Sequence, residues 1–453
     1  MSGPLTWAQQ GTFDEISRYL PGNQPWMFIL RRIPIPSNPS RDEVLALIGK
    51  WIGRHEALHT RIHADEDGNT TQEVAQSGTL EVEVVNHPGK ASAEVAESEV
   101  QQLRNTFVHS ATDLPVRVTV VSIDNAPTDV IACISHVLVD NAGANVAGAD
   151  LAAMLASHAD NGEMPDPLPA REPMDQALHE RTTAGQRINA NSLAHVSTHL
   201  SAGMRGVPME TPHESPRYRA AFLRSDAIAR SARILGRRYS TSSSVVFLAA
   251  MAALLNAVTG SKQHTVGLVC HNRFHPELRS TVGNLAQRAV TTLDADFETM
   301  SHVIAATSKV VLRPYARAQY DTRQVAELLN NHDPSLGIPY RFNDTWSGSV
   351  EHDEPDSARE TDGESCTTFA RTTFRWSECY DKDDLDMVMY LNVEGRPESV
   401  QLRVLVDTYR IPDEAVEPFL RGFERLMTKL VRCEVPLSGV AGLMTSRTQS
   451  TSR

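Results

Sequence analysis

Apolar and polar positions along the chain follow two periods, so that helix-like and strand-like stretches alternate. After Ser40, apolar residues recur every three or four positions, and Ser40 and Glu43 have the spacing of a capping box, which predicts a helix over 40–62. Residues 92–110 show a second helical pattern, and the Ala- and Gly-rich residues 141–159 predict a helix that packs closely on a sheet. Alternation and short apolar runs predict strands over 79–87, 116–123 and 129–136, the last two joined by the turn-prone residues DNAP.

Proline and polar residues dominate from about residue 161 to residue 216, which is typical of a surface connection. The sequence predicts an α/β chain with an N-terminal lobe over 1–165, a connecting segment over 166–216 and a C-terminal lobe over 217–440. The acidic stretch 351–365 is expected to be a solvated loop, and residues 441–453 a disordered tail. In the second lobe, strands are expected near 218–224, 263–273, 386–394 and 399–407, and helices near 241–260, 297–312 and 413–431.

Composition and charge exclude several classes of function. The 453 residues are 41% hydrophobic and 22% charged, which is ordinary for a globular chain. The formal net charge of −13 argues against nucleic acid as the main partner, because phosphates are neutralised by clustered Lys and Arg. No apolar run is long enough to predict a membrane span and no export signal is visible, so we expect a cytoplasmic protein without a membrane partner. Five scattered cysteines predict neither a disulfide framework nor a zinc site.

The sequence lacks the nucleophile elbow, the phosphate-binding loop, the dinucleotide fingerprint and the zinc-protease motif. His271 and His275 have metal-ligand spacing, but a strand end and a following proline disfavour a helix there, so no metal site is expected. In ISHVLVDNAGA, His136 ends a predicted strand, and Asp140 or Asn141 is a suitable N-cap of the predicted helix that follows. A neutral imidazole at such a junction can accept a proton from a nucleophile, and the first helical amides can stabilise an oxyanion. The alternative is a buried histidine and a capping aspartate with no catalytic role.

The surrounding motifs favour the catalytic interpretation. Together they resemble the condensation domains of nonribosomal peptide synthetases, which belong to a superfamily of acyltransferases with an H-x-x-x-D motif. The resemblance runs from about residue 4 to residue 433 and implies two chloramphenicol-acetyltransferase-like lobes in a V-shaped pseudo-dimer, with donor and acceptor entering a tunnel between them. The motifs, in order, are PLTWAQQG (4–11), RHEALHTRI (54–62), ISHVLVDNAG (134–143) and NRFHPELRSTVGNLAQRAV (272–290), followed by FNDTW (342–346) where such domains place an Asn-containing strand.

The resemblance also implies roles for individual residues. His136 aligns with the catalytic histidine, and Asp140 with an aspartate that fixes the loop through an ion pair with an arginine. Arg54 and Arg61 are the candidate partners of Asp140. Gln9 and Arg273 are expected to maintain the fold.

The chain departs from the family pattern at three positions. Ser135 replaces a first histidine, Asn141 replaces a glycine, and His59 stands where arginine is usual, which favours Arg61 as the partner of Asp140. The resemblance places Ser135, Asn141 and Gly143 near the oxyanion and acceptor side of the site.

The function implied is that of a free-standing condensation enzyme, since no adenylation motif or carrier signature is found. It would bind no cofactor of its own, because the donor would be an acyl or aminoacyl thioester on the phosphopantetheine of a separate carrier protein. The acceptor would be a small molecule in natural-product biosynthesis. Both an ester and an amide product are compatible with His136, and the altered Ser135 and Asn141 favour a hydroxyl acceptor, as in enediyne antibiotic assembly. The alternatives are an acyl-CoA-dependent acyltransferase of the same superfamily and a non-catalytic recruitment platform.

Overall fold

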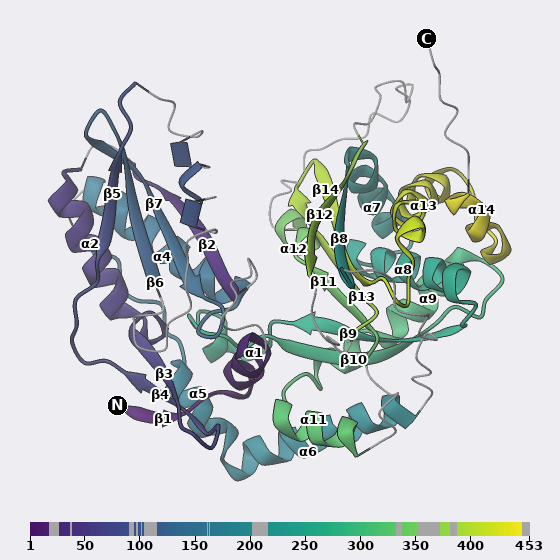
Figure 1. Ribbon diagram of the computed structural model, residues 1–453, viewed down its shortest axis with the longest axis horizontal. Helices are drawn as coiled ribbons and strands as arrows, with labels where there is room; N and C mark the ends of the chain where they lie inside the picture. Colours follow the sequence, from purple (N-terminus) through teal and green to yellow (C-terminus); the bar gives the residue numbers. More distant parts are fainter. Residues whose placement is uncertain are drawn as a thin grey trace. The chain divides into compact units, whose positions relative to one another are not determined.

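The chain folds as two units, each built on its own main β-sheet (Figure 1). Unit 1 comprises residues 1–191, 271–287 and 319–324, and unit 2 comprises residues 192–270, 288–318 and 325–453. The computed structural model describes residues 1–17, 27–36, 39–89, 95–96, 98–100, 102–103, 116–160, 162, 164–201, 216–331, 338–351, 372–380 and 387–445.

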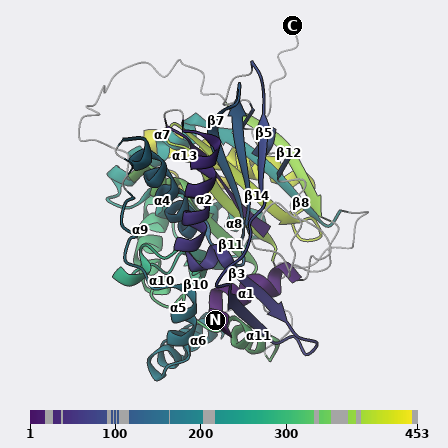
Figure 2. The same ribbon diagram turned by 90° about the vertical axis from the view of Figure 1, so that its left-hand side faces the viewer.

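The main sheet of unit 1 has the strand order β2-β7-β6-β5. β2 (Phe28–Pro34), β7 (Ala126–Ser135) and β6 (Val116–Ile123) are antiparallel, and β5 (Val82–Asn86) runs parallel to β6. Helices α2 (Arg41–Arg54) and α4 (Asn141–Asp160) pack against each other on this sheet (Figures 1 and 2). Unit 1 also contains a small sheet of β1 (Ser2–Pro4), β3 (Thr60–Ala64) and β4 (Thr70–Val74). Its other elements are α1 (Trp7–Ser17), α5 (Pro173–Glu180) and 3₁₀ turns at Glu56–His59 and Pro276–Leu278. The helix α6 (Thr183–Ser201) begins in unit 1, and its residues from 192 on belong to unit 2.

Local sequence accounts for the elements that carry the site. β6 and β7 are rich in β-branched residues and are joined by the two-residue turn Asp124–Asn125, where both φ angles are positive, at 50° and 67°. Asp and Asn tolerate this conformation, and such a turn matches the twist of a hairpin. Ser40 and Glu43 form the predicted capping box at the start of α2. The predicted hairpin and cap are therefore confirmed.

Unit 2 contains a seven-stranded mixed sheet whose one face is covered by a large apolar core. α8 (Ser243–Thr259) is buried over most of its length and ends at Gly260, whose φ of +69° is the left-handed conformation that glycine adopts without strain. Strands follow in the order β10 (Gln287–Asp294), β9 (Gln263–Cys270), β11 (Tyr340–Asp344), β13 (Met389–Arg396), β14 (Ser399–Asp407), β8 (Tyr218–Ser225) and β12 (Thr372–Tyr380). The remaining helices are α7 (Asp226–Arg238), α9 (Met300–Val310), α10 (Leu312–Tyr315), α11 (Thr322–Asn330), α12 (Trp346–Glu351), α13 (Asp413–Arg432) and α14 (Val440–Met444), with a 3₁₀ turn at Leu437–Gly439.

The predicted α/β class is confirmed, but the observed units differ from the predicted lobes. Residues 173–201, inside the predicted connection, form α5 and α6, and α5 buries Met174 and Ala177 although its neighbourhood is rich in proline. Residues 271–287, from the middle of the predicted C-terminal lobe, fold with unit 1. A local pattern does not reveal either feature, because both depend on packing between distant segments.

Four smaller predictions also need correction or lie outside the described residues. The predicted helix over 40–62 ends at Arg54, and residues 60–64 form β3. The predicted tail begins later than residue 441, because Val440–Met444 form α14. The described part of the chain does not include the acidic loop from residue 352 on, most of the helix predicted over 92–110, or residues 446–453.

In the described ranges no single helix has the length and apolarity of a membrane span. Only α7 and α8 taken together, across a 105° bend, have that length and apolarity.

Candidate active site

His136 lies immediately after β7, in a tight turn that leads to α4. Its backbone N–H donates to the carbonyl of Met27 at 2.8 Å, and the turn is closed by the N–H groups of Leu138 and Val139, which donate to the carbonyl of Ser135. The imidazole Nδ1 is 2.9 Å from the carbonyl oxygen of Val139. Because a carbonyl can only accept, the neutral ring carries its proton on Nδ1 and has its lone pair on Nε2. The turn therefore presents a half-buried imidazole in the tautomer that a general base requires.

Asp140, which precedes α4, is the centre of a buried hydrogen-bond network. Its Oδ1 accepts from the N–H of Gly143 at 2.7 Å, which is an N-cap contact, as the sequence predicts. Its Oδ2 accepts from Nη1 of Arg273 at 2.7 Å and from the N–H of Leu285 at 2.9 Å. The Asp140 and Arg273 side chains are only 3% and 5% exposed, so the ion pair is shielded from water and salt. The network ties the start of α4 to the 271–287 segment.

The predicted arginine partners of Asp140 were both wrong. Arg54 instead donates to Asp150 at 2.8 Å, and Arg61 lies on β3 of the small sheet, opposite Glu73 of β4. Arg273, which the sequence assigned to fold maintenance, is 133 positions away from Asp140 in the chain. Its only sequence signal is its place in the NRF motif directly after a strand. The pair forms because the 271–287 segment returns to unit 1.

Gly143 brings two backbone segments into close contact. A Cβ atom at this position would lie 2.5 Å from the carbonyl oxygen of Gly283 and 3.0 Å from Nη2 of Arg273, so no side chain fits. The N–H of Gly143 is donated to Asp140 and is not available to an oxyanion. The structure therefore gives Gly143 a packing and capping role, and its place near the oxyanion and acceptor side stays a prediction.

Asn284 is a site residue that sequence reasoning missed. Its side-chain N–H₂ donates to the carbonyl of His136 at 2.8 Å and to the hydroxyl of Thr12 at 2.9 Å. The carbonyl of the neighbouring Gly283 accepts from the N–H of Asp140 and from Arg273. The 271–287 segment thus holds both ends of the turn that carries His136.

The other predicted residues of this region differ in exposure. Ser135 is buried at the end of β7, and Asn141 is exposed in the first turn of α4. Both oxygens of Asn141, the backbone carbonyl and Oδ1, accept from Nη2 of Arg31 on β2, at 2.8 and 2.6 Å. Burial lowers the pKa of the Arg31 guanidinium to about 10, and Asp140 opposes this shift. Arg31 is a second cation at the site, and nothing in the sequence pattern singles it out.

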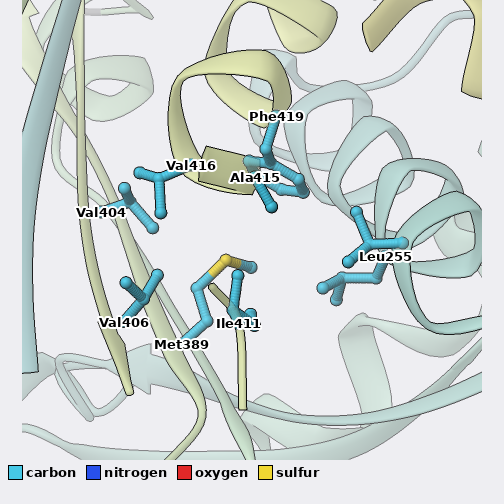
Figure 3. A pocket seen from close by; sticks show the side chains of 9 residues that line it. Leu255, Met389, Val404, Val406, Ile411, Ala415, Val416 and Phe419 are labelled. Atoms are coloured by element: carbon cyan, nitrogen blue, oxygen red, sulfur yellow. The ribbon is translucent and has the colours of Figure 1, made fainter. Parts of the chain in front are cut away.

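His271 is a further titratable group beside the Asp140–Arg273 network. Nδ1 of His271 accepts from the N–H of Arg273, and burial together with Arg273 lowers the pKa of this imidazole. Across the described ranges, no three metal-ligating side chains lie close enough to hold an ion. An apolar cavity in unit 2, between α8, α13 and strands β13 and β14, offers no group for chemistry (Figure 3). It is lined by Leu255, Val258, Met389, Val404, Val406, Ile411, Ala415, Val416 and Phe419.

Comparisons with known proteins all indicate one kind of protein. A family model described as "Condensation domain" matches residues 42–373. The isonitrile lipopeptide synthase of Mycobacterium tuberculosis is 27% identical over 253 residues, which are 52% of this chain and 10% of that protein. Malpinin synthetase of Mortierella alpina is 22% identical over 247 residues, which are 52% of this chain and 3% of that protein. The chain thus matches only a small part of each of these relatives.

Solved structures agree on the fold. SgcC5 of Streptomyces globisporus superposes with a TM-score of 0.70 at 18% identity, covering 95% of this chain and 98% of that one. The starter condensation domain of rhizomide synthetase RzmA superposes with a TM-score of 0.71 at 15% identity, covering 96% of both chains. At these identities the likeness establishes the architecture, as the sequence resemblance implied.

Proposed function

Because the chain belongs to the condensation-domain family, we propose that it transfers an acyl or aminoacyl group from a carrier-protein thioester to a small-molecule acceptor. Family membership supports an acyl-transfer or condensation role in general. The observation that carries the specific proposal is the hydrogen bond between Nδ1 of His136 and the carbonyl of Val139. It leaves Nε2 as the basic nitrogen, on a turn whose two ends are anchored by Asp140 and Asn284.

In the proposed reaction, Nε2 of His136 accepts the proton of the acceptor hydroxyl or amine as that atom attacks the thioester carbon. The carbon–oxygen or carbon–nitrogen bond forms, the carbon–sulfur bond breaks, and the imidazolium returns the proton to the leaving thiolate. A thioester has a good leaving group, so the protein needs to supply only positioning, base assistance and charge stabilisation. Asp140 and Arg273 are positioning residues in this scheme.

We assign stabilisation of the developing oxyanion to the first turn of α4. The N–H of Gly143 is already donated to Asp140, which leaves the preceding N–H groups, those of Asn141 and Ala142, for this role. The side chain at residue 141 does not alter its own backbone N–H. Replacement of the family's glycine by Asn141 is therefore compatible with catalysis.

We favour a hydroxyl acceptor and an ester product. An alcohol gains more than an amine from proton removal in the transition state, because a neutral amine is already nucleophilic. SgcC5, which is similar in fold, was crystallised with a naphthyl-substituted ethanediol. This ligand supports an alcohol acceptor by analogy.

Two alternatives are supported by other solved structures. The RzmA starter domain was crystallised with C8-CoA, which favours a soluble acyl-CoA donor. The X-domain of teicoplanin biosynthesis forms a complex with OxyB, which favours a recruitment platform. The anchored His136 turn counts against the platform, since recruitment does not require a histidine with a fixed tautomer.

The test is intact-mass detection of unloading of a set of acyl- and aminoacyl-carrier proteins, with paired alcohol and amine acceptors. We expect acceptor-dependent unloading by the wild type and a loss of about 10²- to 10⁴-fold in His136→Ala. His63→Ala, which removes an exposed histidine of unit 1, is the control and should keep full activity. Binding without acceptor-dependent unloading, equal in all three proteins, would leave only the platform. Equal use of acyl-CoA and acyl-carrier would favour the CoA-dependent enzyme.

A further inference from the structure

Arg31 extends from β2 to the first turn of α4. It lies opposite Ala132 of β7, three residues before the strand reaches Ser135. Its Nη1 donates to the carbonyl of Leu30 at 2.7 Å, and its Nη2 donates to both oxygens of Asn141. The guanidinium therefore lies beside Asn141. This residue directly follows Asp140 and is five positions after His136 in the chain.

Within the described ranges, the hydrogen-bond acceptors of Arg31 are neutral carbonyl oxygens. A guanidinium has five N–H donors, and Nε–H of Arg31 is buried without a partner in the described part of the protein. Asp140 is the acidic group that acts on Arg31, but both of its oxygens already accept hydrogen bonds, one of them from Arg273. Among the described residues, two guanidinium groups thus share one carboxylate, which leaves a surplus positive charge beside Asn141.

Keeping a charged side chain partly buried costs free energy, and a contact that only holds the structure together does not need that charge. Burial disfavours the charged form of Arg31, as the lowered pKa shows, yet the side chain remains a cation at neutral pH. A neutral side chain could bridge β2 and the Asn141 carbonyls without this cost. The Nε–H is enclosed, Asn141 occupies Nη2 and Leu30 takes one N–H of Nη1, so the second N–H of Nη1 is the donor left for an anion of a ligand, which it binds by a charge-assisted hydrogen bond.

We propose that Arg31, held in place by Asn141, is a specificity-determining residue that recognises an anionic group, such as a carboxylate, on the small-molecule acceptor. This inference rests on the proposed function, because it takes the His136 turn as the place where the acceptor reacts. The anion that Arg31 recognises is a group of the acceptor and not the phosphate of the donor. In a carrier-bound donor the phosphate is separated from the reacting thioester by the whole pantetheine arm, whereas Arg31 contacts the helix turn next to the catalytic loop.

Asn141 has a defined part in this proposal. The resemblance places glycine at this position in related domains, and a glycine would offer only its backbone carbonyl to Arg31. The Asn141 side chain adds a second acceptor, Oδ1, on the same Nη2 atom. The departure from the family pattern at residue 141 thereby orients the cation, while the backbone of the first helical turn is unchanged.

The first test measures binding without any donor, so that it does not depend on turnover. Isothermal titration compares 3-phenyllactate with its methyl ester and phenylalanine with phenylalanine amide, so that each pair differs in its anionic group. We expect the wild type to bind the carboxylates about tenfold or more tightly than their neutral partners, and Arg31→Gln to abolish the difference. Arg117→Gln, which removes an exposed arginine of β6 in the same sheet, should retain it. Arg31→Lys should retain part of the preference, because it keeps the charge and loses the fork geometry.

Three outcomes would overturn the proposal. No preference of the wild type for either carboxylate would show that Arg31 does not recognise an anion of this class. An equal weakening of acid and neutral probe in Arg31→Gln, with a lowered Tm, would show that Arg31 only bridges β2 and α4. A preference for 4′-phosphopantetheine over pantetheine that disappears in Arg31→Gln would assign the cation to the donor.

Once an acceptor that is turned over has been found, steady-state kinetics test this inference separately from the proposed function. We expect Arg31→Gln to raise KM about tenfold or more for an anionic acceptor, with kcat and the kinetics of its neutral ester little changed. Asn141→Gly should raise the same KM by a smaller factor. If His136→Ala unloads carriers as fast as the wild type, the proposed function fails while the binding result on Arg31 still stands.

Discussion

Two helices of unit 1 begin at an acidic N-cap residue, and the two carboxyl groups have opposite surroundings. Asp140, before α4, accepts three hydrogen bonds, one of them from the buried Arg273. Glu172, before α5, makes no side-chain cap contact, and its Oε2 is buried without a hydrogen bond among the described residues. Burial, with the nearby Glu56, raises the pKa of Glu172 to about 7. Acidic residues at equivalent helix positions thus differ in their effect on stability. The difference comes from the hydrogen-bond donors that the tertiary structure places around each carboxyl group.

The comparison shows what makes Asp140 suitable as an anchor for a catalytic turn. A buried carboxylate stabilises a structure when its lone pairs are filled and its charge is paired, and it is costly when they are not. Asp140 is linked to α4 and to the 271–287 segment, so the backbone around His136 is restrained from both sides. Glu172 links nothing through its Oε2 and remains a weakness near the start of α5.

The largest effect is expected from removal of the Asp140 charge. Asp140→Asn leaves Arg273 buried without a counter-ion, so the free energy of unfolding should fall by about 3 to 5 kcal/mol. Urea unfolding measures the loss, and hydrogen exchange of β7 and α4 amides should place it in unit 1. Combining Asp140→Asn with Arg273→Met should recover part of the loss, because the uncompensated charge is removed. If Asp140→Asn alone is neutral, the ion pair is not an anchor.

The second prediction concerns the close backbone contact next to Asp140. Gly143→Ala places a methyl group 2.5 Å from the carbonyl of Gly283, so the variant should lose about 1 to 3 kcal/mol of stability and also turnover. Gly148→Ala on the same helix is the matched control, since the nearest atom to its Cβ is 3.7 Å away. That variant should gain about 0.5 to 1 kcal/mol from helix propensity. Equal effects at the two positions would rule out a specific contact at Gly143.

A pH dependence is expected from Glu172. Its pKa is raised from 4.5 to about 7 on folding, so its stabilising contribution is complete below pH 4.5 and is lost as the pH rises through 7. Glu172→Gln removes this loss. Relative to wild type, it should be more stable by on the order of 1 kcal/mol at pH 8 and equal to it near pH 4. Tm measured at both pH values is the test, with the exposed Glu66→Gln as control. A pH-independent difference would contradict the titration.

The smallest effect is expected at a helix start that has a neutral cap. The Thr6 hydroxyl accepts from the N–H of Gln9, and the Gln9 side chain accepts from the N–H of Thr6, at the beginning of α1. Thr6→Ala should cost about 1 kcal/mol, because it removes this cap while the N–H of Trp7 still donates to Glu180. Thr71→Ala, on an exposed position of β4, is the control in the same chemical-unfolding experiment. A loss no larger than that of Thr71→Ala would contradict the role of Thr6 as a cap.

The segment from β6 to α4 was predictable because its signals are local. The β-branched runs, the Asp124–Asn125 turn, the small residues of α4 and the capping role of Asp140 all lie within 45 consecutive residues, 116–160. Each depends on backbone preferences or on hydrogen bonds between near neighbours. Gln9, which was expected to maintain the fold, accepts from the nearby N–H of Thr6 and also donates to Gln72, 63 positions away.

The sequence by itself therefore determined the α/β class, the strand–turn–helix that carries His136 and the cap that begins α4, since these follow from periodicity and local hydrogen bonding. Only the tertiary structure decided that Arg273 and not Arg54 or Arg61 pairs with Asp140, that Asn284 holds the carbonyl of His136, and that Arg31 reaches Asn141. These partners are separated in the chain by 133, 148 and 110 positions. Such pairs depend on where the chain returns after long connections, and the spacing of residues in the sequence does not reveal where that is.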